Sequence, residues 1–587
     1  MNYSSLAGIY EKLEKTSKRL EKILILSEFL KKIKEDELEQ VILLLQGKVF
    51  PEWDERKLGI AEKIVIKAIN IATGISTENI EKEWKKTGDL GLTTENMIIN
   101  KKQHSLFSQY ITVKKVVSNL EKLAGLSGSG ALDNKVQLIA ELLTSATPKE
   151  AKYIVRTLLE DLRVGLGEGT IRDAIVWAFF GKELNITYDK NENELLISND
   201  DREKYNSYIL KVQEVIDISN DFSKVISKAK KGLKELEKLN IEIGKPVKVM
   251  LAQKVQNLKE GFERVGKPAD LEYKYDGFRM QIHNKDGKIT IFTRRLENVT
   301  LQFPEVIEII KKNVQSNNFI IDCEAVGYDV KTKKYLPFQN ISQRIKRKYK
   351  IDDMAKKYPV ELNIFDILVN EGKTLIKVPF KKRREIIEKI VKPENLKIRL
   401  AENMITSDEK DGEKFYKKSL EAGNEGIILK KLDGIYKPGS RVGFMVKLKP
   451  VMETLDLVVV GAEWGTGKRS GWLTSFTLAC RKDDEFIEIG KVGTGFKELE
   501  HEGGGGFTFQ QMTDLLKPLI IKEKGREVDI KPGLVIEVKY EEIQKSPSYS
   551  SGYALRFPRL VRIREDRSPN ECSSISEVID LFNKQKK

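Results

Sequence analysis

Cysteine and histidine are scarce in this chain of 587 residues, which has three of each. The cysteines are odd in number and far apart, so the sequence offers neither a disulfide framework nor a CxxC metal site. The histidines are equally scattered and form no cluster of metal ligands. The residues concerned are Cys323, Cys480, Cys572, His104, His283 and His501. Their spacing excludes a disulfide-rich module and a metal centre built on these two residue types.

Long hydrophobic runs are missing as well. No apolar stretch approaches the roughly 18 residues that a membrane span requires. The first residues, MNYSSLAGIYEKLEKTSKRLEKIL, carry charges at helical spacing and lack the apolar core of a secretory signal. No internal repeat is visible. We therefore expect a soluble intracellular protein with no membrane partner.

Charged residues are abundant and unevenly balanced. The chain has 103 Lys+Arg against 88 Asp+Glu, a net charge of +15 and a pI of about 9.2. A basic surplus of this kind favours polyanionic partners, nucleic acid first. A lysine-rich surface that only keeps the protein soluble explains the charge equally well. At roughly 100–200 residues per domain, the length predicts about three to five domains.

The residue pattern changes twice along the chain and divides it into regions. Residues 1–245 carry apolar residues at helical spacing, which predicts an all-α domain. Residues 246–449 contain period-two runs with helices between them, as in an α+β domain. Residues 450–587 have shorter, glycine-rich runs, which are typical of a small Greek-key barrel with one helix.

Finer expectations concern the helical region. Thr147 and Pro148 are placed to be the N-cap and first residue of a helix, and Thr170 is a cap candidate for the next one. The polar stretch 188–205 is expected to be a loop between helices.

The stretch LEYKYDGFRMQIH, residues 271–283, raises a chemical question. Strand alternation before the Asp-Gly turn places Lys274 on one face with Glu272 and Asp276, and Arg279 follows the turn. A lysine becomes a nucleophile when it is desolvated or crowded by other cations. The stretch taken alone favours an exposed amphipathic hairpin around an ordinary Asp-Gly turn.

Other segments add groups that would suit the same chemistry. FIIDCEAV is almost wholly apolar but places Asp322 and Glu324 on one side of a strand, and buried carboxylates need a cation or a metal as partner. Glu425 opens the apolar run EGIILKK. Basic residues follow in FMVKLKP, YKPGSRVG and TRRLENVT. A lysine nucleophile, carboxylates for Mg²⁺ and cations for a triphosphate are what nucleotidyl transfer requires.

These segments, in this order, resemble the ATP-dependent DNA ligases. KYDG at 274–277 matches the KxDG signature of covalent nucleotidyltransferases. The similarity is greatest to the archaeal type, which shares its layout with the large eukaryotic replicative ligase, and it extends over nearly the whole chain. The matching segments are KYDGFR, TRRLENVT, DCEAV, FDIL, EGIILKK and MVKLKP, with GKPVKVMLAQ, GTGKRSGWLTSFTLA and LRFPRLVRIREDRSP around them.

The resemblance implies a fold and a reaction. Residues 1–245 would be a helical DNA-binding domain, 246–449 an adenylation (nucleotidyltransferase) domain, and 450–587 an OB-fold β-barrel. The enzyme would seal nicks in duplex DNA during replication, repair and recombination, using ATP and Mg²⁺, with Mn²⁺ as an alternative. It would act as a cytoplasmic, nucleoid-associated monomer.

The resemblance also implies individual roles. Lys274 would attack ATP and carry AMP as a phosphoramidate, Glu272 would recognise the adenine amine, and Phe365 would stack on the ring. The other nucleotide contacts would come from Arg279, Arg294, Glu324, Arg441, Lys447 and Lys449. Glu324 and Glu425 would lie at the metal.

The chain departs from the family pattern at a few positions. Arg567 stands where a lysine is expected, and arginine keeps the charge but not the geometry of a compact ammonium. This puts nucleotide preference or rate in doubt. Met445 replaces an expected tryptophan and should affect packing only. The glycine-rich insert at 500–507 has no functional explanation.

Contacts to a nick should rest on phosphates and shape, because a nick has no sequence of its own. Gly128 and Arg163 lie in glycine-containing segments beside helix starts, where backbone amides suit phosphates, although plain helix-connecting turns explain them too. Lys468 and Arg469 lie in a barrel loop of the kind that contacts nucleic acid. A sliding clamp is a further expected partner, with Gln103 and Phe107 in the segment 100–110 as its contacts.

Two other functions fit parts of the sequence. An RNA ligase or capping nucleotidyltransferase would share the lysine chemistry, but the long helical region argues against it. A DNA-binding scaffold with an inactive nucleotide pocket is the non-enzymatic alternative, and the intact Lys274, Glu324 and Glu425 argue against it. ADP, GTP and NAD⁺ stay open as alternatives to ATP.

Overall fold

The computed structural model describes residues 1–100, 110–128, 130–336, 338–345, 347, 349–450, 454–498 and 507–585. Its contacts divide the chain into two compact units. The first comprises Met1–Ser419 and Asn424–Leu448, and the second comprises Leu420–Gly423 and Lys449–Lys587. No helix within the described ranges is both long and apolar enough to cross a bilayer.

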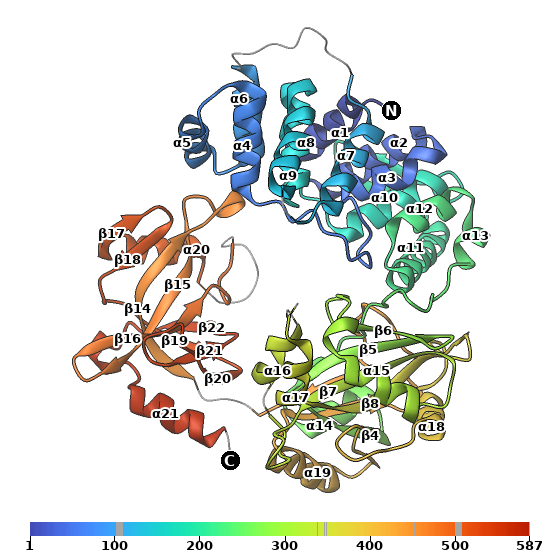
Figure 1. Cartoon of the computed structure of the whole chain (residues 1–587), viewed down its shortest axis with the longest axis vertical. Coiled ribbons are helices and arrows are strands. Elements are labelled where there is room, and N and C mark those ends of the chain that lie inside the picture. Colours follow the sequence, from blue (N-terminus) through green and yellow to red (C-terminus); the bar gives the residue numbers. More distant parts are fainter. Residues whose placement is uncertain are drawn as a thin grey trace. The chain divides into compact units, whose positions relative to one another are not determined.

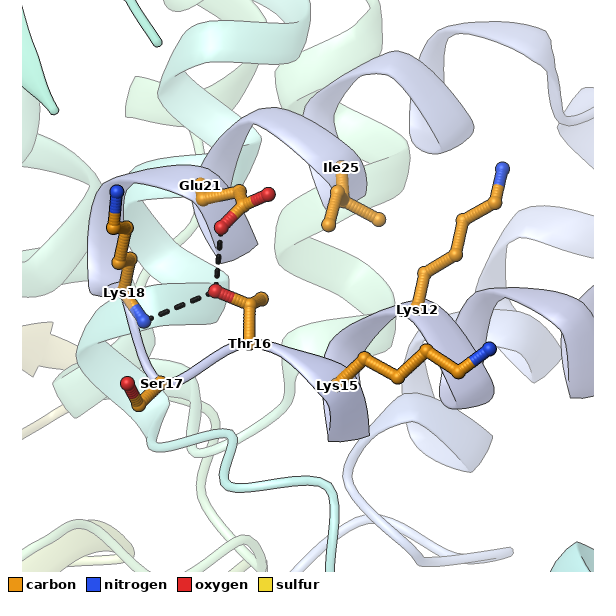
Figure 2. A pocket seen from close by; sticks show the side chains of 7 residues that line it. All are labelled: Lys12, Lys15, Thr16, Ser17, Lys18, Glu21 and Ile25. Atoms are coloured by element: carbon orange, nitrogen blue, oxygen red, sulfur yellow. Dashed lines mark hydrogen bonds between the residues drawn. The ribbon is translucent and has the colours of Figure 1, made fainter. Parts of the chain in front are cut away.

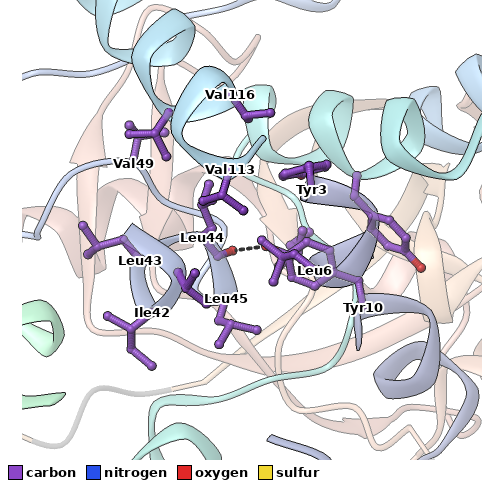
Figure 3. Packing of buried hydrophobic residues seen from close by; sticks show 14 of the residues in the cluster. Tyr3, Leu6, Tyr10, Ile42, Leu43, Leu44, Leu45, Val49, Val113 and Val116 are labelled. Carbon is purple, nitrogen blue, oxygen red and sulfur yellow. Dashed lines mark hydrogen bonds between the residues drawn. The ribbon is translucent and has the colours of Figure 1, made fainter. Parts of the chain in front are cut away.

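The first part of unit 1 is helical, as expected. Its helices are α1 (Tyr3–Lys15), α2 (Arg19–Lys32), α3 (Glu35–Leu45), α4 (Glu62–Thr73), α5 (Thr77–Thr87), α6 (Leu90–Ile99), α7 (Val113–Gly125), α8 (Ala131–Ser145), α9 (Pro148–Leu158), α10 (Glu168–Phe180), α11 (Asn199–Ser219), α12 (Phe222–Lys230) and α13 (Leu233–Glu237). Figure 3 shows part of their shared core, where Tyr3, Leu6 and Tyr10 of α1 pack against α3 and α7. The hydroxyl of Tyr10 donates to the Leu44 carbonyl at 2.7 Å, so burial leaves this polar group satisfied.

The local expectations for this region were partly wrong. Thr147 caps α9 through a capping box with Glu150, as predicted. Thr170 is not a cap, because α10 begins at Glu168 and its N-cap is Gly167. The segment expected to be a loop holds a hairpin of β1 (Thr187–Asp189) and β2 (Glu194–Leu196), and α11 starts within it. Its polar composition hid these short strands, which have little apolar surface to bury.

The second part of unit 1 contains two sheets with helices around them (Figure 1). One sheet has the order β10-β8-β7-β5-β6, with β9 beside β8, and the other has the order β11-β4-β12-β13-β3. The strands are β3 (Gln253–Val255), β4 (Ala269–Lys274), β5 (Phe278–Lys285), β6 (Lys288–Thr293), β7 (Asn318–Gly327), β8 (Val360–Asn370), β9 (Lys373–Thr374), β10 (Ile398–Leu400), β11 (Asn403–Thr406), β12 (Gly426–Lys431) and β13 (Met445–Leu448). The helices are α14 (Leu258–Val265), α15 (Pro304–Asn313), α16 (Phe338–Ile345), α17 (Ile351–Lys357), α18 (Phe380–Ile390) and α19 (Glu409–Glu421).

The KYDG segment crosses from one sheet to the other. β4 ends at Lys274 in one sheet and β5 begins at Phe278 in the other, so the two strands do not form a hairpin. The alternative of an exposed hairpin around an Asp-Gly turn is therefore wrong. A Cβ added at Gly277 would lie 2.5 Å from the Ala325 carbonyl oxygen of β7, so this close crossing requires glycine.

Unit 2 is the predicted β-barrel domain. Its main sheet has the order β16-β15-β14-β18-β17, and β19 pairs with both β14 and β22. Register shifts at Val459/Gly461 and Glu463/Trp464 let β14 bend and pair with β15, β18 and β19. The elements are β14 (Leu455–Trp464), β15 (Leu473–Lys482), β16 (Glu485–Val492), α20 (Phe509–Leu516), β17 (Ile520–Lys524), β18 (Glu527–Ile530), β19 (Val535–Lys539), β20 (Glu542–Lys545), β21 (Tyr553–Arg556), β22 (Arg559–Ile563) and α21 (Ile575–Lys584). The helix α21 was not predicted.

Candidate active site

Lys274 is the last residue of β4, and it lies beside Glu425, the residue that immediately precedes β12. Its Nζ lies 2.6 Å from Oε2 of Glu425, and both side chains are about one-fifth exposed, at 21% and 19%. The Glu425 amide also donates to the Lys274 carbonyl at 2.8 Å, and Gly426 opposes Lys274 in the antiparallel pair. Sheet pairing therefore brings together a lysine and a carboxylate that are far apart in the sequence.

Glu324 of β7 supplies the second carboxylate. It lies opposite Arg279 in the β5–β7 pairing. Burial raises the pKa of Glu324 to about 7, while Lys274 lowers it and Glu425 raises it further. A buried carboxyl near a second carboxylate favours a bound cation, which would let both ionise.

The guanidinium of Arg279 is held by two buried groups, which both bind its Nη2 atom. Nη2 donates to Oδ2 of Asp322 and, at 2.9 Å, to the hydroxyl of Tyr436. Its Nε is buried and has no hydrogen-bond partner among the described residues. The ring of Phe365 lies 5.8 Å from the guanidinium carbon. A donor left unsatisfied next to two carboxylates and a lysine fits an anionic ligand.

Glu272 is almost fully buried, at 2% exposure, between two cations. Its Oε2 lies 2.5 Å from Nζ of Lys430, and its Oε1 lies 3.3 Å from Arg384. Nζ of Lys430 also donates to the Phe365 carbonyl at 3.3 Å and lies 4.9 Å from the Phe365 ring centre. Lys430 thus contacts both side chains that were assigned to the adenine base.

Lys430, Arg384 and Tyr436 were missed from the sequence. Strand alternation in EGIILKK gives Lys430 the opposite face from Leu429, which is fully buried, so in the sequence Lys430 looks like a solvent-facing lysine. Arg384 lies on α18, and Tyr436 lies in a loop. Their positions depend on tertiary packing, which periodicity does not reveal.

The register places a further predicted residue on the same face of this sheet. Ile428 of β12 lies opposite both Glu272 of β4 and Lys447 of β13. Because directly opposed residues point to the same side, Lys447 shares the face of Glu272 and Lys274. Lys449 belongs to unit 2, where its Nζ lies 3.3 Å from Glu541.

The remaining nucleotide candidates are exposed. Arg294 follows β6, and Arg441 lies in the loop before β13, where its carbonyl accepts from Gln253 at 3.1 Å. Arg567 of unit 2 lies 2.8 Å from Asp456. Met445, expected to be a packing residue, is half-buried on β13.

The buried carboxyl of Asp270, on β4 next to the site, makes the stability of the protein depend on pH. Burial first, and then Glu272, raise its pKa from 3.8 to about 7, although Asn403 donates to its Oδ1 at 2.9 Å. Since the folded state holds this proton more tightly, the free energy of unfolding falls as pH rises from about 4 to 7. Asp270→Asn should therefore stabilise the protein by about 2 kcal/mol more at pH 8 than at pH 5. Urea titrations at both pH values measure this, and a pH-independent difference would contradict it.

The DNA-contact candidates differ in their surroundings. Gly128 has φ +90° and open space around its Cβ position. Arg163 also has a positive φ, 56°, and its guanidinium donates to Asp161 at 2.6 Å and to the Gly88 carbonyl at 3.0 Å. Arg469 donates to Glu498 at 2.7 Å and lies over the Phe509 ring.

Several predicted elements lie outside the described residues. These are the clamp contacts Gln103 and Phe107, the side chain of Lys468, and nearly all of the insert 500–507. Figure 2 shows a basic hollow that the sequence did not single out, between the end of α1 and the start of α2. It is lined by Lys12, Lys15, Thr16, Ser17, Lys18, Glu21 and Ile25.

Metal binding can be tested against the donor set. No group of three or more His, Cys, Asp and Glu side chains within the described ranges could hold a metal ion unaided. Glu324 and Glu425 nevertheless fit a hard divalent cation, because such ions take carboxylate oxygens and complete their shell with water and substrate phosphates. The residues present therefore suit a metal that arrives with a nucleotide.

Comparisons with known proteins agree along the chain. Residues 249–449 match the model of the ATP dependent DNA ligase domain, residues 2–176 that of the DNA ligase N terminus, and residues 469–567 that of the ATP dependent DNA ligase C terminal region. A DNA ligase of Nanoarchaeum equitans (strain Kin4-M) is 47% identical over 589 residues, covering 100% of this chain and 99% of the relative. A DNA ligase of Thermococcus fumicolans is 42% identical over 592 residues, covering 100% of this chain and 99% of the relative.

A solved structure described as "Pmar-Lig_Pre." has the same fold, with a TM-score of 0.55 at 19% identity over 95% of this chain and 99% of that chain. The likeness confirms the predicted fold class of a helical domain, a nucleotidyltransferase domain and a C-terminal β domain. Three models of this family match the chain, and it is similar over its whole length to archaeal DNA ligases, so it belongs to the ATP-dependent DNA ligase family.

Proposed function

We propose that this chain seals single-strand nicks in duplex DNA through a lysyl-AMP intermediate on Lys274. The observation that carries the proposal is the 2.6 Å pair of Lys274 and Glu425, with Glu324 and Arg279 around it. Family membership supports ATP as the cofactor together with a divalent metal. We take the metal to be Mg²⁺, with Mn²⁺ as an alternative.

Lys274 would act first as the nucleophile. Its nitrogen attacks the α-phosphorus of ATP, a P–N bond forms, and the bond to the leaving pyrophosphate breaks. The AMP then passes to the 5′-phosphate at the nick, which regenerates the lysine. Finally the 3′-hydroxyl attacks that phosphate, and AMP leaves as the phosphodiester forms. Glu425 would orient the Lys274 side chain for the first attack, since it fixes Nζ at the end of β4.

Glu324 and Glu425 are the residues that would hold the divalent cation. When bound, the cation neutralises charge on the phosphate oxygens. The unsatisfied Nε of Arg279 supports a contact to ribose or phosphate. The phosphates would also be contacted by cations from Arg294, Arg441, Lys447 and Lys449.

Adenine recognition would rest on Glu272 and Phe365, and Lys430 would fix both of them. Lys430→Met leaves the buried Glu272 carboxylate with only one cation, so KM for ATP in the adenylation step should rise at least about tenfold, and the preference for ATP over GTP should fall. Lys431→Met is the matched control, because Lys431 is the next residue of β12 and pairs with Asp433 at 3.6 Å, away from Glu272.

Adenylation rates with labelled ATP and GTP measure this. Equal KM values for Lys430→Met and Lys431→Met would contradict the role of Lys430.

We further propose the domain division 1–245, 246–449 and 450–587, a monomeric cytoplasmic enzyme, and a sliding clamp as an additional partner. Phosphate contacts would come from the segments of Gly128 and Arg163 in the helical domain and from Lys468 and Arg469 in the barrel. Lys12, Lys15 and Lys18, which line the basic hollow of Figure 2, would be further phosphate contacts of the helical domain. Such contacts make nick affinity fall steeply with salt.

A sealing assay tests the proposal. A nicked duplex with a labelled 5′-phosphate is incubated with the protein, ATP and Mg²⁺, and the product is resolved on a denaturing gel. The expected result is a full-length strand that requires ATP. Adenylation of Lys274 without sealing of DNA, but with joining of RNA ends or transfer to a capping substrate, would contradict the DNA ligase function and leave the lysine chemistry intact.

A further inference from the structure

One face of β5 carries a polar series that the proposed reaction leaves unexplained. Arg279 belongs to the nucleotide site, but Gln281 and His283, which follow on the same face, are almost fully buried, at 3% and 1% exposure. Nδ1 of His283 accepts from the Gly244 amide at 2.9 Å. The neutral ring therefore carries its proton on Nε2, which donates to Oε1 of Gln281 at 3.0 Å.

Both ends of the Gln281 amide are used. Oε1 also accepts from the Val247 amide at 2.7 Å. Nε2 donates to Oδ1 of Asp322 at 3.2 Å and to the Val247 carbonyl at 3.4 Å. Donors surround the oxygen and acceptors surround the nitrogen, so the amide has one orientation. Gln281 thereby joins the segment 244–250, which leads into β3, to the buried carboxylate of β7.

Asp322 links Gln281 to Arg279 through hydrogen bonds. Its Oδ2 accepts from Nη2 of Arg279 and, at 3.2 Å, from the hydroxyl of Tyr436. The Tyr436 hydroxyl in turn accepts from the Met250 amide at 3.2 Å and from Arg279 at 2.9 Å. Both ends of the segment 244–250 are thus linked to the Arg279 guanidinium through other side chains. Gly244 is linked through His283, Gln281 and Asp322, and Met250 is linked through Tyr436.

Apolar packing holds the same segment in place. Val247 is buried at 1% exposure in a cluster with Ile320, Leu368 and Tyr436. Burial lowers the pKa of His283 to about 3, so the ring stays neutral and the direction of its hydrogen bonds is fixed. The buried polar atoms of Gln281, His283, Asp322 and Tyr436 have hydrogen-bond partners, which makes this part of the network rigid. Loss of one member leaves buried groups without partners.

We infer that Gln281 and His283 are positioning residues for adenylation, which aim the guanidinium of Arg279 at the nucleotide by fixing Asp322 to the segment 244–250. The inference rests on the proposed function. Asp322 and Tyr436 occupy Nη2 of Arg279 and leave Nε for the substrate. Gln281 keeps Oδ1 of Asp322 occupied, so that the carboxylate presents its other oxygen to Arg279.

The test compares adenylation kinetics in full-length variants. Gln281→Leu removes the centre of the network and should raise KM for ATP about tenfold. The matched control is Asn284→Ala on the same strand, which is also buried and bonds to Gly287 and Ser316 outside the network. It should lose comparable stability and keep the wild-type KM.

A second pair of variants, at His283, separates loss of the hydrogen bond from misfolding. The amide of a glutamine can reach the place of Nε2, so His283→Gln should keep the donor to Gln281, whereas His283→Leu should not. We expect His283→Gln to retain a KM near that of the wild type and His283→Leu to match Gln281→Leu. Hydrogen exchange of the peptide that includes 244–250 should quicken in both leucine variants.

The outcomes are distinct. A KM for ATP within twofold of the wild type in Gln281→Leu or His283→Leu, with thermal unfolding shifted as in Asn284→Ala, would show a purely structural role and overturn the inference. A wild-type chain that forms no adduct with ATP would contradict the proposed function, and the inference with it.

Discussion

Lys274→Ala should abolish adenylation and nick sealing. Alanine has no nitrogen to form the phosphoramidate, and Lys274 is the lysine that the sheet pairing places beside Glu425 and that interacts with Glu324. The expected loss is at least about a thousandfold, because a covalent step is removed and only binding remains. Labelled ATP and a denaturing protein gel measure the adduct, and a nicked duplex measures sealing.

Lys274→Arg separates chemistry from folding. Arginine retains the positive charge beside Glu425, so the ion pair that joins β4 to Glu425 is kept. Its guanidinium stays protonated and is not a nucleophile. The variant should therefore fold and bind nicked DNA like the wild type but form no adduct. An exposed lysine at the far end of β5, Lys285, serves as the control, and Lys285→Ala should be fully active. ATP-dependent sealing by either Lys274 variant would rule out the covalent mechanism at this residue.

Glu425→Gln should have the second largest effect. The change is nearly isosteric but removes the negative charge that lies 2.6 Å from Nζ of Lys274 and one of the two proposed ligands of the cation. We expect the adenylation rate to fall about a hundredfold or more, since charge stabilisation in a shielded site is a large catalytic contribution. The rate should also require a higher Mg²⁺ concentration to saturate.

Nick affinity is the internal control for Glu425→Gln. The variant should bind nicked DNA as the wild type does, because the carboxylate contributes nothing attractive to a polyanion. Glu421→Gln, four residues earlier and exposed, should leave adenylation unchanged. Equal losses of adenylation, nick binding and thermal stability in Glu425→Gln would indicate a folding role in place of a catalytic one.

Local chemistry singled out several residues that the structure brings together in the candidate site. Asp322, Glu324 and Glu425 stood out because carboxylates interrupt otherwise apolar strands, and the structure gives each of them a cation as neighbour. Strand alternation also correctly predicted that Glu272 and Lys274 lie on the same face of the sheet. The pairing that joins Lys274 to Glu425 could not be derived, since it links segments about 150 residues apart and depends on the sheet order.

The failures have physical causes too. Thr170 has the side chain of a good cap, but the helix starts two residues earlier at Glu168. The hairpin β1–β2 was missed because it is polar and short. Lys430 reads as a solvent-facing lysine in sequence, yet Glu272 and Phe365 hold it at 4% exposure. Of these cases, that of Lys430 was decided by a partner distant in the sequence, Glu272, and the other two are local.

The structure shows how Arg567, which departs from the family pattern, is held in the barrel domain. Its guanidinium lies 2.8 Å from Asp456, which also binds Arg564 at 2.7 Å. Both arginines therefore share one carboxylate at the start of β14. The charge expected from a lysine is present at this place, and the planar guanidinium is anchored to the barrel.

The central claim is that Lys274 carries AMP, and intact-protein mass spectrometry tests it most directly. The protein is first treated with pyrophosphate to remove any AMP already attached, then incubated with ATP and Mg²⁺, weighed and digested for peptide mapping. We predict the addition of a single AMP on the peptide that contains Lys274. An adduct only with ADP, GTP or NAD⁺ would keep the mechanism and replace the cofactor. No adduct with any of these nucleotides would contradict the covalent mechanism and favour a DNA-binding scaffold.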